Sequence, residues 1–233
     1  MEQSRFPYRI EKTKNRHSRA ILKNDTIVIR LARNLSRREE LRHVEDLLRR
    51  MKSHLLIDRK KTHIDPFRPL LDGKSMHTIE LESGDTYTFS LVPSKRAGKR
   101  KTVDGWEIRV SPSMKQAALH RSLWNTLSKA RLTQMEELIK EVNERTLKVQ
   151  IKNVRLRIAV SQWGSCSSRG IIAINTALLF VPQQLLEYVI IHELAHIKYP
   201  HHSSRFWGLV AQECPFYEAA RKELKGYRLP TLS

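Results

Sequence analysis

The sequence predicts an α+β fold, in which antiparallel β units with helices precede a more helical last third. Short β-branched segments bounded by turn residues alternate with longer stretches of helical periodicity along the chain. The 233 residues are 40% hydrophobic and include only 8 Gly and 9 Pro, which excludes a low-complexity or collagen-like chain. The chain is also long enough to bury a substantial core.

The N-terminal segment predicts a hairpin followed by a helix. Residues 20–23 and 26–31 flank Asn24 and Asp25, which are typical turn residues. Ser36 and Glu39 have the spacing of a capping box, and an apolar stripe at helical spacing follows as far as about Ile57. We therefore expect one amphipathic helix whose many arginines face solvent.

A second antiparallel unit is expected over the next segment, with strands at 77–81, 86–92 and 105–110. The basic run 95–101 between them predicts an exposed loop. Ser113 and Gln116 open a helical stretch that continues to about Leu147. This change of pattern predicts two domains: a basic, strand-rich N-terminal region over residues 1–112 and a second domain over residues 113–233.

The last third begins with a strictly alternating segment, 154–161, which is typical of a half-buried strand. A turn at 163–170 and a returning strand at 171–175 are expected to follow it. Pro182 is placed as first-turn prolines are, so it predicts the start of a helix that Pro200 should end.

Charge and composition bear on the kind of partner. The chain carries 43 Lys and Arg against 24 Asp and Glu, a net charge of +19, and residues 1–60 alone hold 17 basic and 8 acidic side chains. Such an excess favours either a solvated surface or attraction to a polyanion such as nucleic acid or a nucleotide.

Three further features bear on location and on redox state. The N-terminus lacks the apolar segment of a secretory signal, and the most apolar stretch, 171–181, is too short to span a membrane. With two cysteines, Cys166 and Cys214, in a chain of this length, we expect free thiols. The prediction is a cytoplasmic protein without a membrane partner, and the oligomeric state stays open.

The segment His192-Glu193-Leu194-Ala195-His196 contains the pattern HExxH. Histidines at i and i+4 lie on one face of a helix, so both imidazoles can reach one ion, and the Glu between them is placed to act as a base. Catalytic zinc normally has three protein ligands and one water. The pattern therefore predicts one Zn²⁺ per chain, bound by His192 and His196, with Glu193 as the catalytic residue.

The third ligand is predicted to be His202, six residues after His196, with His201 as a competing candidate. In this hypothesis Glu193 activates a zinc-bound water and then protonates the leaving group. Tyr188, Tyr199 and His201 are candidates for stabilising an oxyanion because they are near in sequence.

A set of motifs around this segment resembles a known family. They are Gln162-Trp163-Gly164-Ser165-Cys166, Ile174-Asn175, Leu178, Pro182, Tyr188-Val189, the His-Glu-Leu-Ala-His core, and His202-Ser203 with Phe206-Trp207. The stretch 154–224 is similar to the YgjP-like (WLM/SprT-related) zincin metallopeptidases. The resemblance implies a zincin-like catalytic domain with an active-site helix, with His192, His196 and His202 as zinc ligands and Glu193 as the general base.

The leading hypothesis is therefore a zinc-dependent hydrolase, most simply a metallopeptidase that acts on a peptide or protein substrate. One alternative is a metal-dependent nucleotide or phosphoester hydrolase, whose substrate the basic surface would attract. A second alternative is a nucleic-acid-binding protein with a structural zinc, closed by a fourth ligand such as His201 or Cys166.

Overall fold

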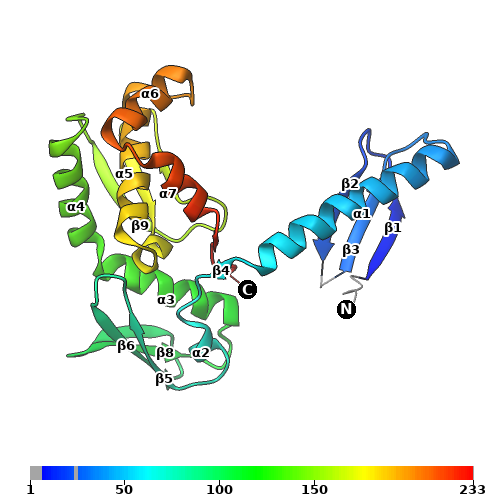
Figure 1. Cartoon of the computed structure of the whole chain (residues 1–233). Coiled ribbons are helices and arrows are strands. Elements are labelled where there is room, and N and C mark those ends of the chain that lie inside the picture. The colour runs from blue at the N-terminus through cyan, green and yellow to red at the C-terminus, as the bar shows by residue number, and fades with distance from the viewer. Residues whose placement is uncertain (1–6, 24–25, 233) are drawn as a thin grey trace. The chain divides into compact units, whose positions relative to one another are not determined.

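The computed structural model describes residues 7–23 and 26–232 (Figure 1). The chain divides into two compact units, Met1–Lys61 and Thr62–Ser233, so the division differs from the boundary expected between residues 112 and 113. The four-stranded sheet within residues 76–110 belongs to the second unit, because its Phe89 and Ile108 share one buried core with Trp124 and Leu127. The two units are described separately below.

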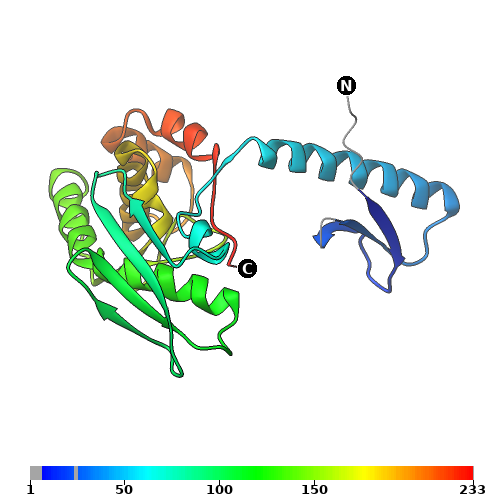
Figure 2. The same cartoon turned by 90° about the horizontal axis from the view of Figure 1, so that it is seen from below.

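The first unit is a three-stranded sheet with one helix along a face (Figure 2). Its elements are β1 (Tyr8–Lys12), β2 (Arg19–Lys23), β3 (Thr26–Leu31) and α1 (Arg37–Arg59), and the strand order is β1-β3-β2. Ile27, Ile29 and Leu31 of β3 form a small core with the apolar stripe of α1. The capping box is confirmed, because the Glu39 carboxylate accepts hydrogen bonds from the Ser36 backbone N–H at 2.8 Å and from its hydroxyl at 2.7 Å.

The strand pairing of this unit is only partly the expected one. β2 and β3 pair in antiparallel fashion as predicted, while the turn residues Asn24 and Asp25 lie outside the described residues. β1, however, pairs in parallel with β3, so the expectation of a purely antiparallel unit is wrong here. The sequence contains no local signal for this pairing, since it joins segments separated by the whole of β2.

The second unit begins with a four-stranded sheet of order β5-β6-β8-β7. Its strands are β5 (Met76–Glu80), β6 (Thr86–Pro93), β7 (Gly98–Lys101) and β8 (Gly105–Val110). The run 95–101, expected to be a loop, contains the edge strand β7, which pairs in antiparallel fashion with β8. Because β7 and β8 form this hairpin, β8 lies beside β6 in parallel orientation, and the expected antiparallel pairing is wrong for these two strands.

Two helices replace the single one expected between residues 113 and 147. They are α3 (Gln116–Ala130) and α4 (Leu132–Arg145). A short helix, α2 (Arg68–Leu71), precedes the four-stranded sheet in the chain. The break lies at Arg131, whose backbone leaves helical geometry at ψ 5° and whose guanidinium donates to Asp85 at 2.9 Å. α3 lies between the two larger sheets of this unit (Figure 1).

The other large sheet has the order β10-β11-β9. Its strands are β9 (Asn153–Arg157), β10 (Gly164–Cys166) and β11 (Ile171–Asn175). The expected strand at 154–161 ends at Arg157 and pairs in parallel with β11, while part of the expected turn at 163–170 forms the edge strand β10. The Asn175 amide holds the connection between β9 and β10 by donating to the carbonyls of Ala159 at 2.7 Å and Gln162 at 2.8 Å.

The remaining elements cover this second sheet or close the unit. They are a 3-10 turn η1 (Thr176–Phe180), the helices α5 (Gln183–Lys198), α6 (Ser204–Glu213) and α7 (Tyr217–Leu224), and the short strands β4 (Thr62–His63) and β12 (Tyr227–Arg228), which pair with each other. Cys166 and Cys214 are free, as predicted. In the part of the chain that the structure describes, no helix is long and apolar enough to cross a membrane.

Candidate metal centre

Helix α5 carries the HExxH segment, and its limits follow from the sequence as expected. Pro182 is the N-cap residue, and the helix ends at Tyr199, whose backbone is extended, immediately before Pro200. Leu185 and Val189 are buried on this helix, which anchors it in the core of the second unit. His192 and His196 therefore lie one turn apart on a rigid element, with ring centroids separated by 5.0 Å.

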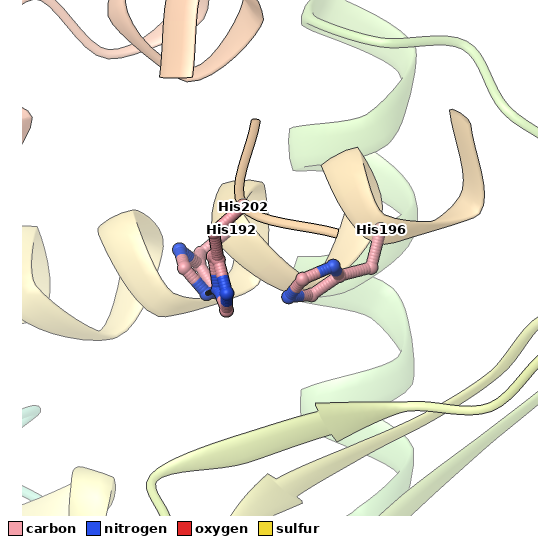
Figure 3. A group of neighbouring side chains, drawn as sticks. All are labelled: His192, His196 and His202. Atoms are coloured by element: carbon pink, nitrogen blue, oxygen red, sulfur yellow. Dashed lines mark hydrogen bonds between the residues drawn. The ribbon is translucent and has the colours of Figure 1, made fainter. Parts of the chain in front are cut away.

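The chain after Tyr199 turns back and brings His202 to the two helical histidines (Figure 3). The Ser203 hydroxyl caps the next helix, α6, by accepting from the Phe206 backbone N–H at 3.4 Å, so His202 sits at the entry to that helix. One ring nitrogen from each of His192, His196 and His202 lies within 4.8 Å of the others, and the Nε2 atoms of His192 and His202 are 3.0 Å apart.

Aromatic rings pack behind this group. The rings of His202 and Trp207 are stacked with centroids 5.5 Å apart, and Trp207 is in turn stacked on Tyr217 at 5.6 Å. The guanidinium of Arg221 lies over the Trp207 ring at 4.9 Å. Phe206 is fully buried, and its ring centroid lies 4.6 Å from that of His196. These contacts restrict the orientations open to the imidazoles.

The electrostatics of His192 and His196 suit a metal ion. Burial lowers the pKa of His192 to about 3, with smaller contributions from His196 and His202, so its imidazole is neutral. The His192 Nδ1 atom is buried and finds no hydrogen-bond partner among the described residues. Burial also lowers the pKa of His196, whose Nδ1 lies 3.3 Å from the Tyr199 carbonyl, which can only accept. A neutral imidazole is the form that binds zinc, and the Tyr199 carbonyl fixes the orientation of the His196 ring.

Glu193 points toward the edge strand β10. The residue is 5% exposed, and burial raises the pKa of the carboxyl to about 8. Gly164 of β10 makes the space for it: a Cβ at Gly164 would lie 2.6 Å from Glu193 Oε1 and 2.7 Å from Cγ. No local sequence pattern predicts this role of Gly164, which the sequence marks only as part of the motif from Gln162 to Cys166.

A pocket joins these groups. Gly164, Cys166, Glu193 and the three histidines line it, together with Ser165, Ser167, Ser168, Gly170, Ile197 and Pro200. Cys166 and His201, the two candidates for a further ligand, lie outside the group of three histidines. Burial, and then the charge of Glu193, raises the pKa of the Cys166 thiol to about 11.

The candidates for oxyanion stabilisation are not brought to the pocket. None of Tyr188, Tyr199 and His201 is among its described lining residues. Tyr188 is buried, with its ring 5.9 Å from that of His192, and the Tyr199 carbonyl faces His196. Their role in stabilising an oxyanion stays a prediction.

Comparison with protein families now identifies the chain. Residues 16–227 match the family described as "YgjP-like, metallopeptidase domain". The chain belongs to this family. The match extends well beyond the stretch 154–224 that carried the resemblance, so both compact units form part of the YgjP-like domain.

Among solved structures, the chain is similar to the crystal structure of the metallopeptidase zymogen of Pyrococcus abyssi abylysin, with 26% sequence identity. The match covers 41% of this YgjP-like chain and 98% of that chain, and its TM-score is 0.34. A comparison with curated proteins found no match.

Proposed function

We propose that this YgjP-like protein is a zinc-dependent metallopeptidase whose active site is the pocket between α5 and β10. The observation that carries the proposal is the meeting of three histidine side chains with one buried glutamate in that pocket. Membership of a metallopeptidase family supports the reaction class. The substrate is a peptide or protein, and one zinc ion is bound per chain.

His192, His196 and His202 would hold the zinc. A zinc ion bound there would supply Lewis acidity, polarising the scissile carbonyl and acidifying a water molecule. The open arrangement supports a catalytic site over a structural one, because a structural zinc normally has four protein ligands and the described residues group three. The alternative of a nucleic-acid-binding protein with a structural zinc is therefore less well supported.

Glu193 acts as the general base and then as the general acid. Its carboxylate takes a proton from the attacking water and delivers it to the nitrogen of the leaving amine. The buried position beside Gly164 holds the carboxylate in one orientation and strengthens its hold on that proton. Both properties are those required of a group that must accept a proton and return it within one reaction.

Two observations favour a peptide over a phosphoester. β10 is an edge strand paired only with β11 among the described strands, and an edge of this kind can pair with an extended peptide. The described lining of the pocket contains no Lys or Arg, the side chains that most often bind phosphate oxygens. The basic surface of the chain therefore lies elsewhere than the pocket.

The test combines metal analysis with activity on the full-length protein. His192→Ala and His196→Ala should each lose the zinc, while Glu193→Gln should retain it and lose about 10²- to 10⁴-fold in peptide hydrolysis. Glu187→Gln is the matched control, since Glu187 lies on the same helix but pairs with Arg145 at 2.6 Å. Full activity in Glu193→Gln, or hydrolysis of nucleoside triphosphates but not of casein-type peptides, would refute the proposal.

A further inference from the structure

A groove in the second unit is lined by Lys and Arg side chains from segments that are distant in sequence. Its lining includes Lys99 of β7, Arg121, Ser122, Asn125 and Lys129 of α3, and Leu156 of β9. We call it the basic groove. None of its described lining residues is Asp or Glu. It lies at the β9 edge of the sheet whose opposite edge, β10, faces the candidate metal centre.

The basic groove has no carboxylates because the stretches of the chain that line it lack Asp and Glu. Residues 86–103, 108–135 and 146–186 contain no Asp or Glu, and these stretches supply β7, α3 and β9. A solvated surface normally mixes both signs of charge, as α1 does with its Arg49 and Asp46 pair. The fold therefore assembles three acid-free segments at one place, which a scan along the sequence does not reveal.

The cations of the basic groove are not neutralised within the chain. Over the described residues, neither Arg121 nor Lys129 forms an ion pair, and both are exposed. Lys99 contacts neutral groups, with its Nζ 3.4 Å from Thr126 Oγ1 and 5.9 Å from the centre of the Trp106 ring. Burial, and then the charge of Lys129, lowers the pKa of Lys99, so a bound anion would relieve repulsion that the protein alone leaves in place.

We propose that the basic groove binds the sugar–phosphate backbone of a nucleic acid. Arg121 and Lys129 are separated by eight residues of one helix, about 12 Å along its axis, so an extended polyanion contacts both without either side chain folding back. That span covers three to four phosphates of one strand at a rise of about 3.4 Å. Ser122 and Asn125 lie between the two cations and offer neutral donors for phosphate oxygens.

The chemistry of the lining favours a nucleic acid over an acidic protein. Protein interfaces draw most of their energy from buried aromatic and apolar anchors, and the described lining of the groove offers only Ala118 and the already buried Leu156. The lining also contains no aromatic side chain on which unpaired bases could stack. Binding should accordingly be independent of base sequence, with a duplex bound at least as tightly as a single strand.

The test measures binding of a fluorescent duplex to the full-length protein by anisotropy between 50 and 200 mM salt. Arg121→Ala combined with Lys129→Ala should weaken binding at least about tenfold and reduce the slope of log K against log salt by about 1.8, since each phosphate contact contributes about 0.9. Lys140→Ala combined with Lys222→Ala removes the same charge from exposed positions outside the groove and should change affinity less than about twofold.

The outcomes distinguish binding in the basic groove from general charge attraction, and a nucleic acid from an acidic protein. Equal weakening by the two double variants, or no effect of the groove variant, would overturn the proposal in favour of general charge attraction. Competition by polyglutamate as effective as by nucleic acid of equal charge would overturn the choice of ligand. Circular dichroism and zinc content should match the wild type, and if the groove variant unfolds, Lys129→Ala alone should still lower the slope by about 0.9.

Discussion

Replacing Gly164 by Ala should displace Glu193 and destabilise the second unit. The added Cβ would lie 2.6, 2.7 and 2.9 Å from Oε1, Cγ and Cδ of Glu193, all well inside ordinary van der Waals contact. Because Cγ and Cδ are approached as well as the carboxylate oxygen, the whole side chain must shift, so overpacking should cost about 1–3 kcal/mol of the free energy of unfolding. For a unit of this size, that corresponds to a fall in Tm of about 2–12 °C.

The assay is thermal or urea unfolding of the chelator-treated protein, in which loss of metal cannot contribute. Glu193→Ala removes all three contacting atoms, so in that background Gly164→Ala should cost almost nothing, and the double-mutant cycle should give a coupling of about 1–3 kcal/mol. Gly208→Ala is the matched control, since a Cβ there meets nothing within 4 Å in α6, and it should stabilise by about 0.5–1 kcal/mol.

The reasoning also makes a prediction for function. In the zinc-loaded protein, Gly164→Ala should retain zinc but lose peptide hydrolysis by a factor close to that of Glu193→Gln, because the base is misplaced rather than removed. Wild-type stability in Gly164→Ala, or a cost that is the same with and without the Glu193 side chain, would refute the close approach of β10 to this carboxylate.

Three other predictions concern the surroundings of the site. His202→Ala should abolish tight zinc binding, while His201→Ala should retain it. Zinc affinity measured with a competing chelator checks this prediction. Loss of zinc in His201→Ala but not in His202→Ala would exclude His202 as the third ligand. Trp207→Ala should weaken zinc binding about 10- to 100-fold because the indole is stacked on His202 and fixes its orientation, whereas Trp207→Phe should restore most of the affinity in the same titration; equal loss in both would indicate a role other than stacking. Burial raises the pKa of Cys214 to about 11 from an ordinary value of 9.0, so its contribution to stability is complete below pH 9 and is lost as pH rises toward 11. The stability advantage of the wild type over Cys214→Ala should therefore shrink by about 1–3 kcal/mol between pH 9 and 11 in urea unfolding, and a constant difference would contradict this.

Local signals predicted individual elements well. The capping box at Ser36 and Glu39 begins α1 as expected, and Pro182 and Pro200 bound α5. These signals succeed because caps, prolines and helical periodicity act within a few residues of one another. The same locality explains why the four-residue spacing of His192 and His196 is enough to place both side chains on one face of a helix.

Long-range pairing escaped prediction. The parallel pairs of β1 with β3, β6 with β8 and β9 with β11 each join segments separated by at least one other strand. The residues of β7, Gly98–Lys101, are almost all basic and so predict a loop, whereas an edge strand with one neighbour tolerates such residues. The division of the chain after Lys61 likewise depends on which sheet shares a core with α3.

The sequence by itself determined the helix with its two histidines, the glutamate between them and the class of chemistry that this spacing favours, since 3.6 residues per turn leave little freedom over five positions. Only the tertiary structure decided that His202 rather than His201 completes the group, that Gly164 makes room for Glu193, and that Lys99, Arg121 and Lys129 meet in one groove. Each of these depends on how a turn or a strand packs against a distant helix. Such packing is set by the whole core and not by the residues adjacent in sequence.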